Sequence, residues 1–328
     1  MFYLGIDISK AKLDCCLLLT PERKRSKTVF NSTAGFAQLV AWLKHHLPDA
    51  APCDIHAVME GTGVYHQGAA TALHDAGLLV SVANPAQARD FAKAMGLRTK
   101  TDAVDSFALA QYGLRVQPSA WRPPAPHARV LQALLARHTA VQEDVQRERN
   151  RLEKTLVAGG VDAVRASLEK SLVFLQQQLA DIEREINSHI DKHPDLKESS
   201  TLLQSIPAVG PAVSRQMLEC LHSKAFRSAE QLAAYLGLVP VERQSGTSLL
   251  GRARLSKAGP AKVRSVLYMA AIVATRHNPH VKAQYEALLK RGKCKMAALG
   301  AAMRKLVHLG FGVWKSRQPY NPKFAQNT

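Results

Sequence analysis

The chain has 328 residues, 46% hydrophobic and 21% charged, so it can form two domains with buried cores and has the composition of a folded protein. Its formal net charge is +18. Residues 201–328 hold 20 lysines and arginines against 4 acidic residues, a net of +16, and residues 1–200 hold the remaining +2. Such a basic excess in one part of the chain predicts a polyanionic partner there, nucleic acid before an acidic membrane surface.

The cysteines and the apolar runs indicate where such a chain works. Five cysteines form no Cys-x-x-Cys pair, which argues against a disulfide framework or a zinc site. No apolar run is long enough to span a bilayer, and the N-terminus lacks the pattern of a signal peptide. We expect a cytoplasmic protein with reduced thiols and no membrane partner.

Residues 1–117 alternate between short apolar runs and amphipathic segments, a pattern typical of an α/β domain with a mixed sheet. Two of the apolar runs end on an acidic residue. Strands are expected at 2–9, 13–19, 55–60 and 78–83, with Val29-Phe30 as a further short apolar pair. Helices are expected at 35–46 and 65–76, followed by helical segments to about residue 114.

Residues 118–196 read as a linker and a helical spacer. Four prolines within 118–126 predict a domain boundary. Two apolar stripes follow, on either side of Gly159-Gly160, and predict an antiparallel helical hairpin or coiled coil. The first stripe is Leu131, Leu134, Leu135, His138, Val141 and Val145, and the second is Leu168, Leu172, Leu175, Leu179, Ile182 and Ile186. The partner of each stripe lies either within the chain or in a second copy, so the segment is either a spacer or a dimerisation element.

Residues 197–328 form the basic segment, which we expect to be a compact and mainly helical domain. Its first unit, 202–218, reads as helix, Ile-Pro-x-Val-Gly turn and helix. This resembles a helix–hairpin–helix motif, in which backbone N–H groups near Gly210 approach a DNA phosphate.

Four acidic residues in the N-terminal part form the first candidate site: Asp7, Glu60, Asp102 and Asp105. Asp7 and Glu60 end strands, and Asp102 and Asp105 are spaced to share one face of a helix. Oxygen-only ligands suit Mg²⁺, with Mn²⁺ as the second choice. The competing interpretation is that each acid is a helix cap or a solvated surface residue, and Thr101-Asp102 is indeed a good helix start.

The second candidate site, residues 243–259, interleaves hydroxyls, glycines and cations. The glycines allow a backbone to approach a phosphate, and the cations neutralise it. One hydroxyl there is either a phosphate ligand or a nucleophile whose transition state the cations stabilise. The cations are Arg243, Arg252, Arg254 and Lys257, and the residues alone do not choose among Ser245, Thr247, Ser248 and Ser256.

Taken in order along nearly the whole chain, these segments resemble the IS110 family of insertion-sequence transposases. The resemblance rests on Gly5-Ile-Asp-Ile-Ser-Lys, Glu60-Gly-Thr-Gly-Val-Tyr, Asn84-Pro, Lys100-Thr-Asp-Ala-Val-Asp, Leu202–Gly210, Ser245-Gly-Thr-Ser, Ser256-Lys-Ala-Gly and Arg304-Lys. It implies an N-terminal RuvC-like domain of the RNase H-like fold (1–117), a coiled-coil spacer (118–196) and a C-terminal transposase domain (197–328).

The resemblance also implies roles for these residues. Asp7, Glu60, Asp102 and Asp105 become a catalytic Mg²⁺ quartet, and Ser245 becomes the nucleophile of DNA strand exchange. The residues expected to bind nucleic acid are Lys100, Gly210, Arg243, Arg252, Arg254 and Lys257. Donor and target DNA, a structured guide RNA, a homodimer or dimer of dimers and a nucleoid location complete the expectation.

Two other function classes remain open from the sequence. In a RuvC-like junction nuclease the quartet would activate water, and Ser245 would only bind phosphate. In a non-catalytic nucleic-acid scaffold, the acids would be dispensable for recombination.

Overall fold

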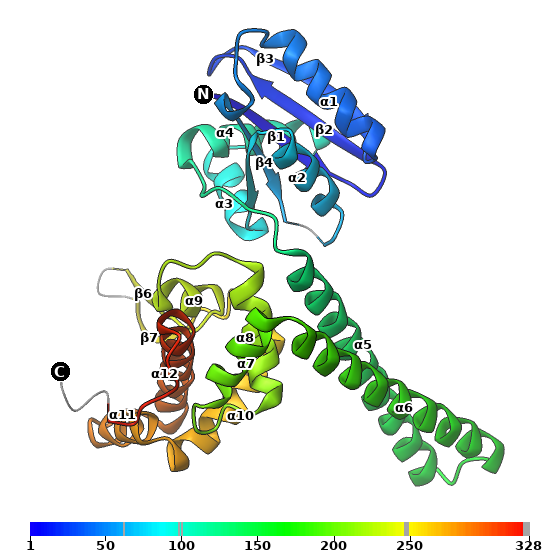
Figure 1. Ribbon diagram of the computed structural model, residues 1–328, viewed down its shortest axis with the longest axis vertical. Helices are drawn as coiled ribbons and strands as arrows, with labels where there is room; N and C mark the ends of the chain where they lie inside the picture. Colours follow the sequence, from blue (N-terminus) through cyan, green and yellow to red (C-terminus); the bar gives the residue numbers. More distant parts are fainter. Residues whose placement is uncertain (62, 98, 100, 246–248, 324–328) are drawn as a thin grey trace. The chain divides into compact units, whose positions relative to one another are not determined.

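A computed structural model describes residues 1–61, 63–97, 99, 101–245 and 249–323, with the side chains of 243–252 left out. The chain divides into two compact units, Met1–Pro123 and Pro124–Thr328 (Figure 1). Each unit has its own core and is described by itself.

The N-terminal unit is built on one mixed sheet with the strand order β3-β2-β1-β4-β5. β1 pairs antiparallel with β2, and β2 pairs antiparallel with β3, whereas β4 is parallel to β1 and β5 is parallel to β4. The strands are β1 (Phe2–Ile8), β2 (Lys12–Leu18), β3 (Lys24–Phe30), β4 (Ile55–Glu60) and β5 (Leu79–Ala83). The α/β class and the mixed sheet predicted from the sequence are therefore confirmed.

Helices cover both faces of this sheet. Leu4 and Ile6 of β1 point into a core that includes Leu39 of α1 and Leu73 of α2. The opposite face carries α3 and α4, because Val58 of β4 packs with residues of both helices. The helices are α1 (Thr33–His46), η1 (Pro52–Asp54), α2 (His66–Asp75), α3 (Pro85–Ala94) and α4 (Asp102–Val116).

Gly5 brings α4 unusually close to β1. A Cβ atom at Gly5 would lie 2.0 Å from the carbonyl oxygen of Ser106 and 2.3 Å from the amide nitrogen of Ala110. Only a residue without a side chain allows this approach. The contact fixes where α4 crosses the sheet, and so where its first turn lies.

The C-terminal unit begins with a long helical hairpin and continues as a helical body. Its elements are α5 (Pro126–Val157), α6 (Asp162–Lys192), α7 (Pro194–Gln204), α8 (Pro211–Ser223), α9 (Ala229–Tyr235), β6 (Pro240–Ser245), β7 (Leu249–Leu255), α10 (Ala261–His277), α11 (Pro279–Lys290) and α12 (Lys295–Ser316). The base of the hairpin shares the core of the body, since Leu131 and Ile186 pack in one cluster with Leu203 and Leu306. The hairpin and the body thus belong to one compact unit, Pro124–Thr328.

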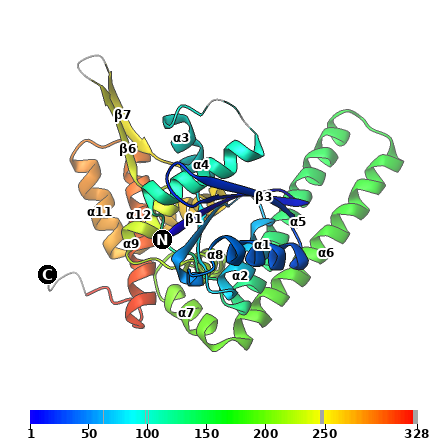
Figure 2. The same ribbon diagram turned by 90° about the horizontal axis from the view of Figure 1, so that it is seen from above.

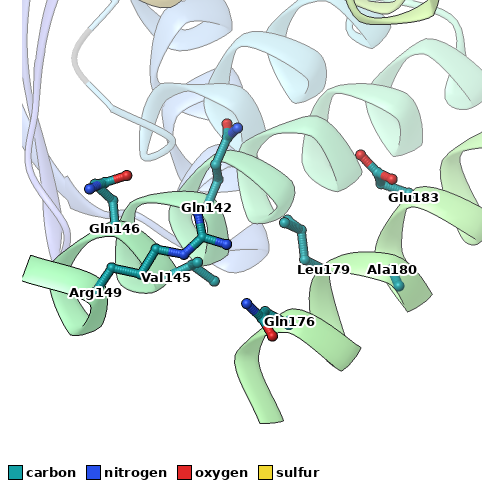
Figure 3. A pocket seen from close by; sticks show the side chains of 8 residues that line it. All are labelled: Gln142, Val145, Gln146, Arg149, Gln176, Leu179, Ala180 and Glu183. Atoms are coloured by element: carbon teal, nitrogen blue, oxygen red, sulfur yellow. The ribbon is translucent and has the colours of Figure 1, made fainter. Parts of the chain in front are cut away.

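The two apolar stripes of the spacer face each other within the chain. α5 and α6 pack along one another, and Val141, Val145, Leu172 and Ile186 are buried. Near the middle the helices leave a groove of ≈ 420 Å³ (Figure 3). Side chains from both helices line it: Gln142, Val145, Gln146, Arg149, Gln176, Leu179, Ala180 and Glu183.

A two-stranded hairpin, β6–β7, projects from the helical body (Figure 2). The sequence patterns did not predict these strands, because the segment is rich in glycine, serine and arginine and lacks apolar alternation. Among the hairpin side chains that the structure describes, Val241, Ala253 and Arg254 are exposed.

Across the described ranges of the chain, no helix is both long enough and apolar enough to cross a membrane.

Candidate functional site

Three carboxylates lie at one end of the N-terminal sheet, on the face that α4 crosses. Side chains alternate between the faces of a strand, so Asp7 shares the face of Gly5, and Glu60 shares that of Val58. Asp14 of β2 is the direct cross-strand partner of Asp7. Residues directly opposite in an antiparallel pair point to the same side. Asp7, Asp14 and Glu60 therefore project toward the same edge of the unit.

The other two predicted acids come from the first turn of α4. The Thr101 hydroxyl caps this helix by accepting a hydrogen bond from the amide of Val104 (3.4 Å). Asp102 and Asp105 follow on the stripe that continues to Ser106 and Leu109, which pack against the sheet. The segment can both start a helix and supply ligands, because the residue that caps α4 is Thr101, which leaves Asp102 and Asp105 available for a site.

Lys12 holds two of these carboxylates. Its Nζ lies 2.7 Å from Oδ2 of Asp102 and 3.0 Å from Oδ2 of Asp14. The hydrogen bond from Lys12 lowers the pKa of Asp102. The Thr28 hydroxyl also donates to Oδ1 of Asp14 (2.7 Å).

Asp7 carries the signature of a crowded acidic site. Burial raises the pKa of its carboxyl from 3.8 to about 6, and the charges of neighbouring carboxylates contribute to this rise. Those neighbours, in order of effect, are Asp105, Asp102, Asp14 and Glu60. The other three acids predicted from the sequence therefore all act electrostatically on Asp7.

The carboxylates are near one another without forming a closed ligand set. Within the described ranges, no three His, Cys, Asp or Glu side chains are gathered closely enough to hold a metal ion. The donor set is nevertheless all oxygen, and the raised pKa of Asp7 marks negative charge that a cation would relieve.

Asp14 and Lys12 were not among the residues predicted from the sequence, although a signal for them existed. Two strands joined by a short turn place residues in register from the turn outward, so an acid at position 7 faces one at position 14. Lys12 begins β2 at the same edge.

The second candidate site lies in the C-terminal unit, and the structure describes part of it. Ser245 is the last residue of β6 and pairs with Leu249 of β7. The side chains of Ser245, Arg243 and Arg252 lie outside the described residues, as do Lys100, Thr247 and Ser248 entirely. Arg254 is exposed on β7.

The segment that follows the hairpin is a tight structural turn. Lys257 is exposed with a φ of 56°, and its amide donates to the carbonyl of Gly237 (3.2 Å). A Cβ at Gly259 would lie 1.9 Å from the carbonyl oxygen of Tyr235. The Ser256 hydroxyl is buried, with no hydrogen-bond partner among the described atoms. Its burial argues against Ser256 as a nucleophile for DNA.

Gly210 is the N-cap residue of α8, after the turn that follows α7. A Cβ there would meet no atom within 4 Å, so its backbone is open to a ligand. α7, a short turn and α8 follow one another. That they form a helix–hairpin–helix motif that binds phosphate stays a prediction.

Comparison with known proteins identifies the class. A family model of the DEDD type, described as a transposase, matches residues 4–159. A second model, described as the transposase IS116/IS110/IS902 family, matches residues 200–286. The chain belongs to the IS110 family of transposases. Transposases act on DNA, which defines the substrate class.

Two of the individual relatives match 99% of the chain. The pilin gene-inverting protein of Moraxella lacunata is 29% identical over 99% of both chains, and that of Moraxella bovis is 28% identical over the same share. An IS110 protein of Streptomyces coelicolor is 28% identical over 53% of this chain and 44% of its own length. The Thermus thermophilus RuvC structure matches 37% of this chain and 99% of its own, at 15% identity and a TM-score of 0.26.

Proposed function

We propose that the protein is a DNA recombinase that cuts and exchanges the strands of an insertion element through Ser245. The observation that carries this proposal is the acidic end of the N-terminal sheet, where burial and the charges of Asp105, Asp102, Asp14 and Glu60 raise the pKa of Asp7 to about 6. The position of Ser245 on a projecting hairpin in the basic unit supports the choice of nucleophile.

The four acids would hold Mg²⁺, or Mn²⁺ in its place. All the donors are carboxylate oxygens, which these ions prefer. A bound divalent ion polarises a phosphoryl oxygen and neutralises charge that develops on it. Lys12 would then keep Asp14 as its partner, since Asp102 would turn to the ion.

Ser245 carries the covalent step. Its Oγ attacks the phosphorus, a P–O bond to serine forms, and the P–O bond to one deoxyribose oxygen of the DNA breaks. The serine gives up its proton, and the departing DNA oxygen takes one. Attack on the phosphoserine by another DNA hydroxyl reverses the step, so no water and no redox partner is consumed. Arg243, Arg252 and Arg254 would stabilise the charge on the phosphate.

Strand exchange of this kind serves both transposition and inversion. The likeness to the pilin gene-inverting proteins over 99% of both chains favours a site-specific reaction between two defined DNA sites. The same chemistry inverts or moves a segment, depending on how the two sites are arranged.

An in-cell recombination assay tests the function. The element is placed beside a reporter, and the junctions are counted by sequencing. We expect Ser245→Ala and Asp7→Asn each to abolish junctions, whereas Ser248→Ala, a matched change in the same segment, leaves them. A scaffold role predicts that Asp7→Asn has no effect.

The rival nuclease is tested on purified protein. If the quartet activates water, Ser245→Ala cleaves junction DNA with Mg²⁺ at the parent rate. Serine attack predicts instead that cleavage is lost and that no protein–DNA adduct forms.

We also propose a structured guide RNA and a homodimer or dimer of dimers as partners. The resemblance to the IS110 family motivates these partners, and the basic excess of residues 201–328 favours nucleic acid among them. Sequencing of RNA that copurifies with the tagged protein tests this. The expected product is one structured transcript from the flank of the gene, and a random sample of cellular RNA contradicts it.

A further inference from the structure

Two grooves in the C-terminal unit join along α12. The first, of ≈ 430 Å³, lies between the base of the β6–β7 hairpin and α12, with Ala297, Gly300 and Ala301 in its lining. The second, of ≈ 770 Å³, lies between α12 and residues 318–322. Lys305 and His308 line both grooves, so the two are adjacent along α12, and together they are called the path.

The path is electropositive. Arg304 and Lys305 line it, and no Asp or Glu is among the described residues that do so. Glu230 of α9 approaches His308 to 3.9 Å from outside the lining. Burial, with the nearby cations, lowers the pKa of His308, so this imidazole is neutral at pH 7 and leaves the positive charge to Arg304 and Lys305.

An aromatic pair linked by a hydrogen bond lies in the second groove. The Tyr320 hydroxyl and Nδ1 of His280 lie 2.8 Å apart, and the two rings meet edge to face with centroids 5.4 Å apart. The Tyr320 hydroxyl also lies 3.2 Å from Oδ1 of Asn278. Nε2 of His280 is buried and has no hydrogen-bond partner among the atoms described. Both side chains line the second groove, so this pair lies where a ligand in the groove would meet it.

The path connects the two motifs of this unit. At one end the amide of Tyr320 donates to Oγ of Ser205, in the turn between α7 and α8 (2.8 Å). At the other end lie Pro240 and Leu255, which begin and end the hairpin that carries Ser245. A ligand in the path would therefore run from the turn between α7 and α8 to the hairpin that carries Ser245.

We propose that this path binds a single strand of the DNA that is being recombined, with phosphates on Arg304 and Lys305 and one base against Tyr320 and His280. The inference rests on the proposed function. Cations along a groove, with an aromatic ring for the bases, are the chemistry that recognises single-stranded nucleic acid. In a duplex the base faces are already stacked and could not meet Tyr320.

Binding of a fluorescent oligodeoxythymidylate of about 12 nucleotides to the full-length protein tests the proposal. The measurement uses the Ser245→Ala variant, in which binding does not depend on cleavage. A failure of the binding proposal is therefore distinguishable from a failure of the serine mechanism. We expect R304Q/K305Q to weaken binding about tenfold and to lower the slope of log K against log salt by about 1.4. Tyr320→Leu should weaken binding about tenfold, whereas Tyr320→Phe keeps the ring and stays near the parent.

The matched control is K290Q/R291Q, which removes the same charge from the exposed end of α11. An equal loss of affinity in this control would show that only net charge matters, and it would contradict the proposed binding path. Unchanged affinity of R304Q/K305Q, with an unchanged melting temperature, would also contradict it. Tighter binding of oligouridylate through the same residues would assign the path to RNA and overturn the choice of DNA.

Discussion

The ionised carboxyl of Asp7 lowers the stability of the folded state. Its carboxyl is partly buried beside four other carboxylates, and within the described contacts only Asp102 and Asp14 have the ammonium of Lys12 as a partner. Such clustering destabilises the folded state at neutral pH and is retained where the charge has a use. The raised pKa of Asp7 is thus a functional indicator that motif matching does not provide.

The first prediction concerns pH. The folded-state pKa of Asp7, about 6, lies above its ordinary value of 3.8. The protonated form therefore stabilises the fold below about pH 4, and this contribution is lost as pH rises through about 6. Without metal, we expect Asp7→Asn to stabilise the protein by about 1 kcal/mol at about pH 7.5 and to have little effect at about pH 4, measured by thermal melting.

The control for this measurement is Asp49→Asn, at an exposed position. It should change the melting temperature little at either pH. If Asp7→Asn were less stable than the parent at about pH 7.5, the proposed cost of the ionised Asp7 carboxyl would be contradicted.

The second prediction concerns divalent ions. Ligands that bind only the folded state raise its stability in proportion to RT ln(1 + [L]/Kd). Mg²⁺ should therefore raise the melting temperature of the parent, and Asp7→Asn should lose this increase. Lys12→Gln removes the cation that competes for Asp102, so it should lower the Mg²⁺ concentration at half effect. An unchanged Mg²⁺ response in all three proteins would remove the metal from the proposal.

At the scale of the element, close packing of α4 on β1 decides whether the site exists. Asp102 and Asp105 are carried by α4, and the position of α4 depends on the missing side chain at Gly5. Sequence patterns predicted the strand and the helix, but they contain no information on how closely the two approach.

The third prediction tests this contact. Gly5→Ala places a Cβ against backbone atoms of α4, which cannot yield as a flexible side chain would. We expect a loss of about 3 kcal/mol in unfolding free energy and a weaker Mg²⁺ response, measured by denaturant titration. Gly68→Ala in α2 is the control, because its nearest neighbours are ring atoms of Phe36 at 3.5 Å. It should be neutral or stabilise by up to about 1 kcal/mol. Equal effects of the two changes would refute the packing argument.

The sequence predicted most elements because their apolar periodicities are strong. The helical hairpin is an example, since Leu131 and Ile186 fall on the expected stripes and are buried. β3 was not predicted as a strand, and only the apolar pair Val29-Phe30 at its end was noted, because its first part is a polar edge strand with mostly exposed side chains. β6 and β7 were missed because their segment is rich in glycine, serine and arginine and lacks apolar alternation. At the candidate site, strand ends indicated Asp7 and Glu60, whereas Asp14 and Lys12 required the strand register.

At the scale of the whole molecule, the candidate metal ligands Asp7, Glu60, Asp102 and Asp105 belong to one unit. Ser245 and most of the basic excess belong to the other. The proposed reaction requires both. Separation of the charges by unit means that DNA affinity and metal affinity can be altered independently.

The fourth prediction uses this separation. Arg254 and Lys257 are exposed in the basic unit, and each is expected to bind a phosphate. R254Q/K257Q should lower the salt slope of duplex DNA binding by about 0.9 for each phosphate that is no longer neutralised, with the Mg²⁺ response unchanged. R23Q/R25Q in the N-terminal unit removes the same charge and should leave the slope as it is. A reversed pattern would place the DNA-binding surface on the N-terminal unit and contradict the account.

The central claim is that serine, and not water, attacks the DNA. The most direct measurement is mass spectrometry of the protease digest of protein trapped on a DNA substrate with a nick beside the cleavage site. The account predicts one peptide that carries a nucleotide on Ser245, formed with Mg²⁺ and absent from Asp7→Asn. Cleaved DNA without any protein-linked nucleotide, or a nucleotide linked to another residue, would contradict it.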